Sequence, residues 1–198
     1  LITAAAFEND DFAKIVGSKK YKRENGQVWY NKNKILSTLE GGDGVKTGYT
    51  KKAGRCLVAS ATRKGARYIA VVLNCSPMFE RCSDLLNEAF SKYPPTKICG
   101  DEEISEREVF DGLEDRKLMT RTEKSVVLPL GENERGKIKT VTEWDEKTIL
   151  PVKEGQTVGK IHFYLDKDLI FSCKLVTING IEKRSFQDVL KEVAKRWS

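Results

Sequence analysis

The sequence is poor in the residues that mark metal and redox proteins. It has a single histidine, His162, and its five cysteines form no Cys-x-x-Cys pair, which excludes the usual spacings of zinc ligands. We therefore expect no metal site and no cofactor, and we expect most cysteines to act as small buried apolar residues. No apolar run approaches the ~20 residues that cross a bilayer, so no transmembrane helix is predicted.

The start of the chain also lacks an initiator methionine and a signal-peptide pattern. Its first seven residues, Leu-Ile-Thr-Ala-Ala-Ala-Phe, are typical of a helix interior, so we expect a piece of a longer polypeptide with any export signal upstream. The net charge is +6, yet no cluster of Lys and Arg alternates with aromatic residues in one motif. A solvated charged surface is therefore favoured, and nucleic acid is not an expected partner.

Two short helical pieces and a polar loop are predicted at the start. Residues 1–16 favour helix, with Asn9 or Asp10 as a cap between the pieces. Residues 17–43 are rich in Gly, Asn and charged residues, which predicts irregular structure. We expect the Trp29-Tyr30 pair to fix this loop to an apolar surface.

A strand-rich pattern and a long helix follow. Strands are predicted over residues 44–50, 55–62 and 68–75, with short turns between them. The run 68–73 is continuously apolar, which predicts burial on both faces. Ser76 and Pro77 suit the start of a helix whose apolar residues recur at helical spacing. The residues Tyr93-Pro94-Pro95-Thr96 end it, and residues 94–96 are predicted to be an interdomain linker.

Residues 97–182 predict a small all-β domain, most simply a sandwich. The expected strands are 125–128, 137–141, 148–150, 158–165 and 169–178. A hairpin turn is expected at Asp166-Lys167-Asp168. The segment carries no cluster of catalytic groups, and His162 is interpreted as a half-exposed strand residue.

The last segment, residues 183–198, predicts an amphipathic helix with a basic flank. Two interpretations are open: a helix that lies on an anionic membrane surface, or a helix packed on its own β domain. The residues that would meet the membrane are Phe186, Leu190, Val193, Trp197, Lys191 and Lys195.

The triplet Lys46-Thr47-Gly48 is the main candidate for chemistry. Glycines before it leave the backbone open to a ligand, and strand alternation points Lys46 and Gly48 to one side and Thr47 to the other. A ligand lying along the strand edge would meet main-chain groups and a cation, which suits a peptide carboxylate. A phosphate-binding loop is excluded, because Val45 precedes the lysine and strand, not helix, follows.

The segment 43–50 (Asp-Gly-Val-Lys-Thr-Gly-Tyr-Thr), with the apolar strands and the helix after it, resembles the C-terminal part of D-alanyl-D-alanine carboxypeptidases. These are low-molecular-mass penicillin-binding proteins. The resemblance implies an α+β fold. A partial penicillin-binding (β-lactamase-like transpeptidase) domain at 1–93 would be followed by the linker, the β domain at 97–182 and the helix at 183–198.

The resemblance also implies an acyl-serine mechanism acting on peptidoglycan stem peptides and inhibited by β-lactams, on the outer face of the cytoplasmic membrane. Lys46 would supply positive potential, Thr47 and Gly48 would bind the substrate carboxylate, and the Tyr49 N–H would be an oxyanion donor. Some relatives carry His at the position of Tyr49, so specificity is open there. Arg81 would back the carboxylate site or would be an ordinary surface arginine.

The chain contains neither Ser-x-x-Lys nor Ser-x-Asn. The nucleophile is therefore expected upstream of Leu1, the chain alone should be inactive, and the upstream part is an expected partner that completes the domain. The alternatives are a non-catalytic β module that serves as a membrane-proximal stalk, and an inactive regulator with the same fold.

Overall fold

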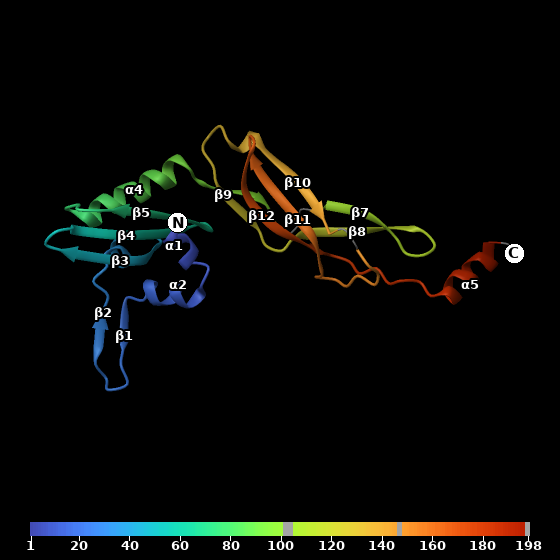
Figure 1. The fold of residues 1–198 in the computed structure, drawn as a ribbon, viewed down its shortest axis with the longest axis horizontal. Coiled ribbons are helices and arrows are strands. Elements are labelled where there is room, and N and C mark those ends of the chain that lie inside the picture. Colours follow the sequence, from blue (N-terminus) through green and yellow to red (C-terminus); the bar gives the residue numbers. More distant parts are fainter. Residues whose placement is uncertain (101–104, 146–147, 197–198) are drawn as a thin grey trace. The chain divides into compact units, whose positions relative to one another are not determined.

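The computed structural model describes residues 1–100, 105–145 and 148–196 (Figure 1). The chain divides into two compact units. Unit 1 comprises Leu1–Thr96 and Val127–Glu132, and unit 2 comprises Lys97–Val126 and Asn133–Ser198.

Unit 1 is built on a three-stranded antiparallel sheet in the order β3-β4-β5. The strands are β3 (Gly42–Thr50), β4 (Gly54–Arg63) and β5 (Ala66–Val72), and the helix α4 (Met78–Lys92) packs on one face. The helix contributes Cys82, Leu86 and Phe90 to a core that also contains Leu57 and Ala59 of β4. The predicted strands and helix are confirmed within a few residues. Ser76 is not the cap, because Pro77 holds that position and no side chain caps the helix.

The opposite face of this sheet is only partly covered. The helices α1 (Ile2–Ala6) and α2 (Asp10–Gly17) lie over its Gly44 end, where a Cβ on Gly44 would stand 3.1 Å from Val16. The predicted cap is confirmed at Asn9, whose side chain accepts the N–H groups of residues 11 and 12. The prediction that residues 68–73 are buried on both faces was wrong: Val71 and Leu73 are 56% and 74% exposed, because no described element covers them.

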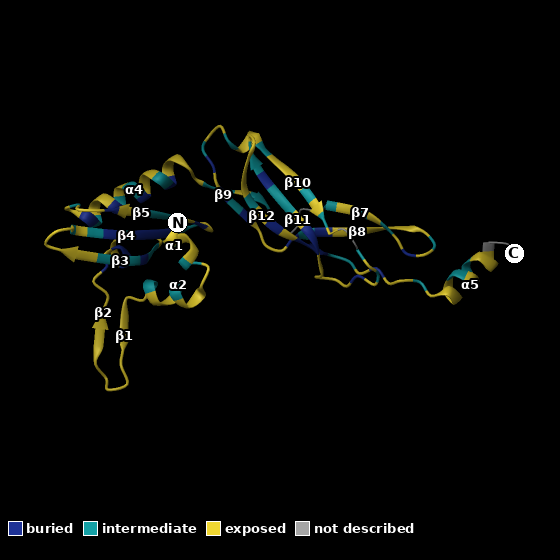
Figure 2. Cartoon of the chain, in the orientation of Figure 1, coloured by how far each residue is buried: buried dark blue, intermediate teal, exposed yellow. Residues whose placement is uncertain are grey.

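The segment 17–43 is more regular than the sequence predicted. It forms a hairpin of β1 (Lys20–Lys22) and β2 (Val28–Tyr30), followed by the short helix α3 (Ile35–Thr38). Figure 2 shows the hairpin exposed along its whole length. The prediction that Trp29-Tyr30 fixes a loop to an apolar surface was wrong, since these rings are 54% and 75% exposed.

Unit 2 contains a five-stranded antiparallel sheet in the order β10-β11-β12-β8-β7. Its strands are β7 (Ser105–Phe110), β8 (Asp115–Thr122), β10 (Ile138–Trp144), β11 (Thr157–Leu165) and β12 (Asp168–Thr177). Two short strands, β6 (Pro95–Cys99) and β9 (Val126–Pro129), lie where the chain passes between the units, and unit 2 also contains the 3₁₀ turn η1 (Arg135–Lys137) and the helix α5 (Phe186–Arg196). Leu118, Val152, Val158 and Ile181 form a buried cluster.

The sequence missed β7 and β8, whose charged residues hide the apolar alternation. The strand predicted at 148–150 was wrong, because these residues are irregular. The hairpin turn between β11 and β12 is confirmed, with Asp166 at φ 55°.

None of the five cysteines, all of them among the described residues, forms a disulfide bond. Only Cys82 and Cys173 are buried and the other three are half-buried, so the prediction that most cysteines are buried was wrong. Burial, and secondly the neighbouring Cys75, raises the pKa of Cys82 to about 11. This thiol therefore stays protonated and unreactive at neutral pH.

Candidate functional site

The strand β3 forms an open edge of the unit 1 sheet. It pairs only with β4 in the strand order β3-β4-β5, so its other edge leaves alternate N–H and C=O groups free in the described structure. Lys46, Gly48 and Tyr49 are exposed, and Thr47 is half-buried. A peptide can therefore reach this edge and add to the sheet as a further strand.

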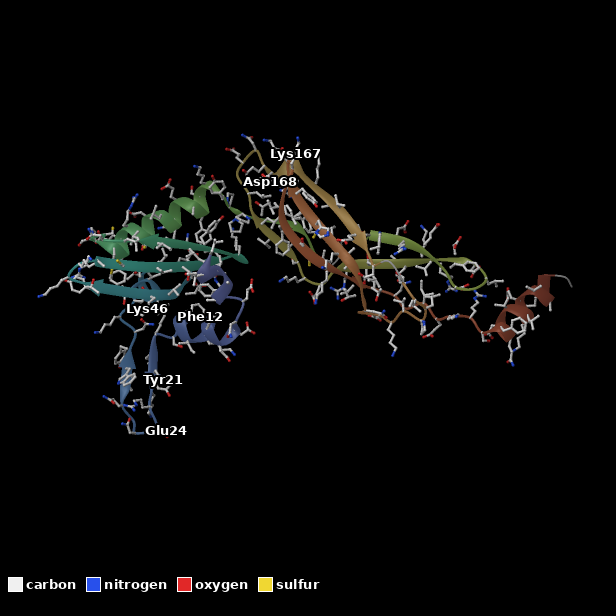
Figure 3. All side chains as sticks on the ribbon, in the orientation of Figure 1. Phe12, Tyr21, Glu24, Lys46, Lys167 and Asp168 are labelled. Atoms are coloured by element: carbon white, nitrogen blue, oxygen red, sulfur yellow. The ribbon has the colours of Figure 1, made fainter. Side chains whose placement is uncertain are left out.

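The register of β3 decides where its side chains lie. Lys46 is opposite Val58, on the face away from α4, whereas Thr47 is opposite Leu57, which belongs to the core beneath α4. The two sides that strand alternation predicted are thus observed. The Lys46 ammonium donates to the Thr47 carbonyl, and no carboxylate contacts it among the described residues. Its charge is therefore available to an anionic ligand at this edge (Figure 3).

A polar cluster that the sequence did not reveal fixes the start of this strand. One Asp43 carboxylate oxygen accepts the Ser60 hydroxyl at 2.6 Å. The other oxygen accepts the Thr62 hydroxyl at 2.5 Å and the Arg67 Nε at 3.0 Å. The Arg67 guanidinium also lies 3.8 Å from the ring centre of Phe7, the residue directly after α1. The cluster therefore ties all three strands and α1 together just before Lys46.

In the sequence, only the spacing of the hydroxyl residues on β4 indicated this cluster. Ser60 and Thr62 are two residues apart, so they share one face of β4, and Arg67 pairs directly with Thr62. The carboxylate that accepts their hydrogen bonds is that of Asp43 on β3. The pairing register of β3 with β4 cannot be predicted from the sequence.

Arg81 lies on α4, where it is exposed. No hydrogen bond or ion pair joins it to residues 46–49 within the described residues. Its assignment to the carboxylate site therefore stays a prediction.

His162 lies on β11, between β10 and β12 in the unit 2 sheet. Its Nδ1 is 2.8 Å from the Ser172 hydroxyl, and its Nε2 is 2.9 Å from a Glu143 oxygen. Ser172 is its direct partner in the register of β11 and β12, and Glu143 comes from β10 on the other side. The side chain is 17% exposed, as expected for a half-exposed strand residue in a cross-strand polar network.

The helix α5 presents its apolar residues to solvent. Phe186, Leu190 and Val193 are 77%, 52% and 37% exposed, at spacings of four and three residues. Lys191 and Lys195 are exposed too, whereas Trp197 lies outside the described residues. The residues before the helix are fixed by Arg184, whose Nε donates to the buried Asp111 carboxylate at 2.9 Å. No described helix is long and apolar enough to cross a membrane.

Unit 1 thus combines a three-stranded sheet, a helix behind it and an open Lys-Thr-Gly edge, and an antiparallel β unit follows it in the chain. Residues 2–77 match the family model of D-alanyl-D-alanine carboxypeptidase, and residues 96–183 match that of the penicillin-binding protein 5 C-terminal domain.

Individual relatives agree with these matches. D-alanyl-D-alanine carboxypeptidase DacF of Bacillus subtilis is 27% identical over 96% of this chain and 51% of its own length. DacA of Haemophilus influenzae is 31% identical over 88% of this chain and 43% of its own length. The crystal structure of penicillin-binding protein 5 from Haemophilus influenzae superposes with a TM-score of 0.57 at 28% identity, over 91% of this chain and 54% of that one.

The chain belongs to the D-alanyl-D-alanine carboxypeptidase family of penicillin-binding proteins. It spans about half the length of the curated relatives that it matches.

Proposed function

We propose that this chain supplies the carboxylate-binding strand of a serine-type D-alanyl-D-alanine carboxypeptidase that trims peptidoglycan stem peptides. In the complete enzyme a serine oxygen attacks the D-Ala-D-Ala carbonyl, the terminal D-Ala leaves as the amine, and water then cleaves the acyl-serine ester. β-Lactams would be inhibitors that acylate the same serine. The observation that carries this proposal is the exposed, unpaired edge at residues 46–49 of β3.

Each residue of that edge has a chemical task in the proposal. The Lys46 ammonium provides positive potential for the terminal carboxylate of the substrate, and the Thr47 hydroxyl donates a hydrogen bond to it. Gly48 leaves the edge clear. The backbone N–H of Tyr49 stabilises the developing oxyanion, an interaction worth about 3 kcal/mol in such sites. Arg81 is proposed to add positive charge behind the carboxylate.

The upstream part of the same polypeptide is proposed to complete the domain and to carry the nucleophile, since the chain contains no Ser-x-x-Lys. One observation supports a missing cover: Val71 and Leu73 leave an apolar part of the sheet exposed among the described residues.

Peptide binding to the isotopically labelled chain tests the role of the strand. Addition of a peptide ending in D-Ala-D-Ala should shift the NMR signals of the amides of residues 46–49. The amides of β5, the other edge of the same sheet, provide the internal control. Thr47→Val, which removes the hydroxyl and keeps the shape, should weaken the shifts, and Lys52→Met in the adjacent turn should not. Equal shifts at both edges would contradict the proposal.

Labelled penicillin tests the placement of the nucleophile. The 198-residue chain should form no covalent adduct, and a stoichiometric adduct in mass spectrometry would refute the upstream position of the serine. This experiment also addresses the alternative of a non-catalytic stalk or inactive regulator, because only the enzyme hypothesis predicts that a longer form containing Ser-x-x-Lys is acylated.

We further propose that α5 lies on the outer surface of the cytoplasmic membrane. Its exposed Phe186 and Leu190 and its exposed lysines favour this over packing on the β unit. Removal of residues 183–198 should abolish co-sedimentation with anionic vesicles. Replacing both Phe186 and Leu190 by Ser should weaken binding about tenfold or more, since each buried side chain contributes roughly 1.5–3 kcal/mol. Gln187→Ser is the matched control, and equal binding by all forms would dismiss the membrane role.

A further inference from the structure

The hairpin of β1 and β2 is the most solvent-exposed ordered part of unit 1. Every residue from Ser18 to Lys32 is exposed. The segment carries five cations, Lys19, Lys20, Lys22, Arg23 and Lys32, against the single carboxylate of Glu24, a net charge of +4. The prediction that no basic cluster lies beside aromatic residues was wrong, because residues 19–23 already form a basic run around Tyr21 and strand pairing adds Trp29 and Tyr30.

The register gives each face of the hairpin an aromatic ring beside a cation. Tyr21 is directly opposite Trp29, and the Arg23 guanidinium lies 4.9 Å from the Trp29 ring centre. Lys20 is opposite Tyr30 on the other face. The side chains of residues 21 and 23–25 line a hollow near the tip. Figure 3 shows Tyr21 and Glu24 on this hairpin, away from the strand that carries Lys46.

The hairpin is held at its tip and its root, although two isolated strands are only marginally stable in water. At the tip the Arg23 N–H donates to the Gln27 carbonyl at 2.8 Å. At the root the side-chain Nδ2 group of Asn31 donates to the Ser18 carbonyl at 3.1 Å. The chain then passes through the buried Asn33 into α3, which packs on β3. The exposed rings are therefore presented by a fixed support that is joined to the proposed substrate strand.

Exposed aromatic rings beside cations suit a polymer of sugar rings that bears acidic groups. The C–H faces of sugars stack on aromatic rings, and carboxylates pair with Lys and Arg. Covering the hairpin with another part of the protein would instead remove the hydration of several unpaired cations. We propose that this hairpin binds the glycan strand of peptidoglycan and its peptide carboxylates. This inference rests on the proposed function, since it takes the same polymer as its ligand.

Co-sedimentation of the full 198-residue chain with purified insoluble peptidoglycan tests the proposal. Replacing Tyr21 and Trp29 by Ala should weaken binding at least tenfold, and replacing Lys20 and Lys22 by Gln should weaken it several-fold and reduce its salt dependence. The matched control is the Lys51→Gln, Lys52→Gln pair, which removes two exposed cations from the turn after β3 and should change binding less than twofold. Replacing both Tyr21 and Trp29 by Phe keeps the rings and should retain binding, which separates loss of contact from loss of the hairpin.

Two results would overturn the proposal: binding that is unchanged in the Ala and Gln pairs, or equal affinity for a single-stranded oligonucleotide of similar charge, which would indicate a general polyanion site. Soluble glycan fragments with and without stem peptides distinguish the sugar from the carboxylate as the ligand. If fragments without stem peptides bind as well as those with them, the sugar rings are the ligand. If only fragments with stem peptides bind, the carboxylates are the ligand. The proposed function fails separately, because it predicts NMR shifts at residues 46–49 that the hairpin substitutions should leave intact.

Discussion

We expect the Asp43 carboxylate to hold the start of β3 in place. The substitution Asp43→Ala tests this. The substitution removes the acceptor of three hydrogen bonds at 2.5–3.0 Å, from Ser60, Thr62 and Arg67. Hydrogen bonds to a charged group contribute about 1.5–3 kcal/mol each when buried. Asp43 and Arg67 are 25% and 34% exposed, so water replaces part of this loss. Ser60 is fully buried and has no such replacement.

We therefore expect Asp43→Ala to destabilise unit 1 by about 2–4 kcal/mol, and Asp43→Asn, which keeps one acceptor oxygen, by roughly half as much. Native-state hydrogen exchange is the appropriate assay, because it reports local opening residue by residue. The amides of residues 45–49 should exchange faster, and those of β11 in unit 2 serve as the internal control.

A double-mutant cycle with Ser60→Ala makes the reasoning refutable. Because the two side chains share a hydrogen bond, their effects should be non-additive by about 1 kcal/mol or more. An Asp43→Ala effect below about 0.5 kcal/mol, or strictly additive effects, would show that the cluster does not hold the strand.

Three further predictions concern stability. Leu86→Ala empties a site that is 1% exposed beneath the sheet, so it should lower the free energy of unfolding by about 2–5 kcal/mol in urea titrations. Gly54→Ala should cost more than about 1 kcal/mol, because Gly54 has φ +67° and a Cβ there would collide with the Asn74 amide; an unchanged urea midpoint would contradict this. The N–H of Glu114 lowers the pKa of Asp111 most, burial opposes this, and the N–H of Leu113 and the Arg184 guanidinium lower it further. A lowered folded pKa stabilises unit 2 above the unfolded pKa of about 4, and this stability is lost as pH falls through the folded value. Asp111→Asn should remove that part of the acid dependence in unfolding measured from pH 7 to pH 2.

The candidate site and the fold were predictable to different degrees. The strands β3, β4 and β5 and the helix α4 follow from hydrophobic periodicity and turn residues, and the Lys46-Thr47-Gly48 triplet from its glycine context. The hairpin at 18–31 was missed because its strands are short and exposed on both faces, so they lack the alternation that marks a half-buried strand. Charged residues masked β7 and β8 in the same way.

The sequence by itself determined the family, the succession of β3, β4, β5 and α4, and the residues of the proposed carboxylate strand, because each depends on local patterns along the chain. Only the tertiary structure decided that β3 is an open edge, that Asp43 gathers its three donors, and that Tyr21 meets Trp29 across a hairpin. These three facts depend on strand order and register. Both are set by contacts between residues distant in sequence, and a shift of one residue would turn every side chain to the other face.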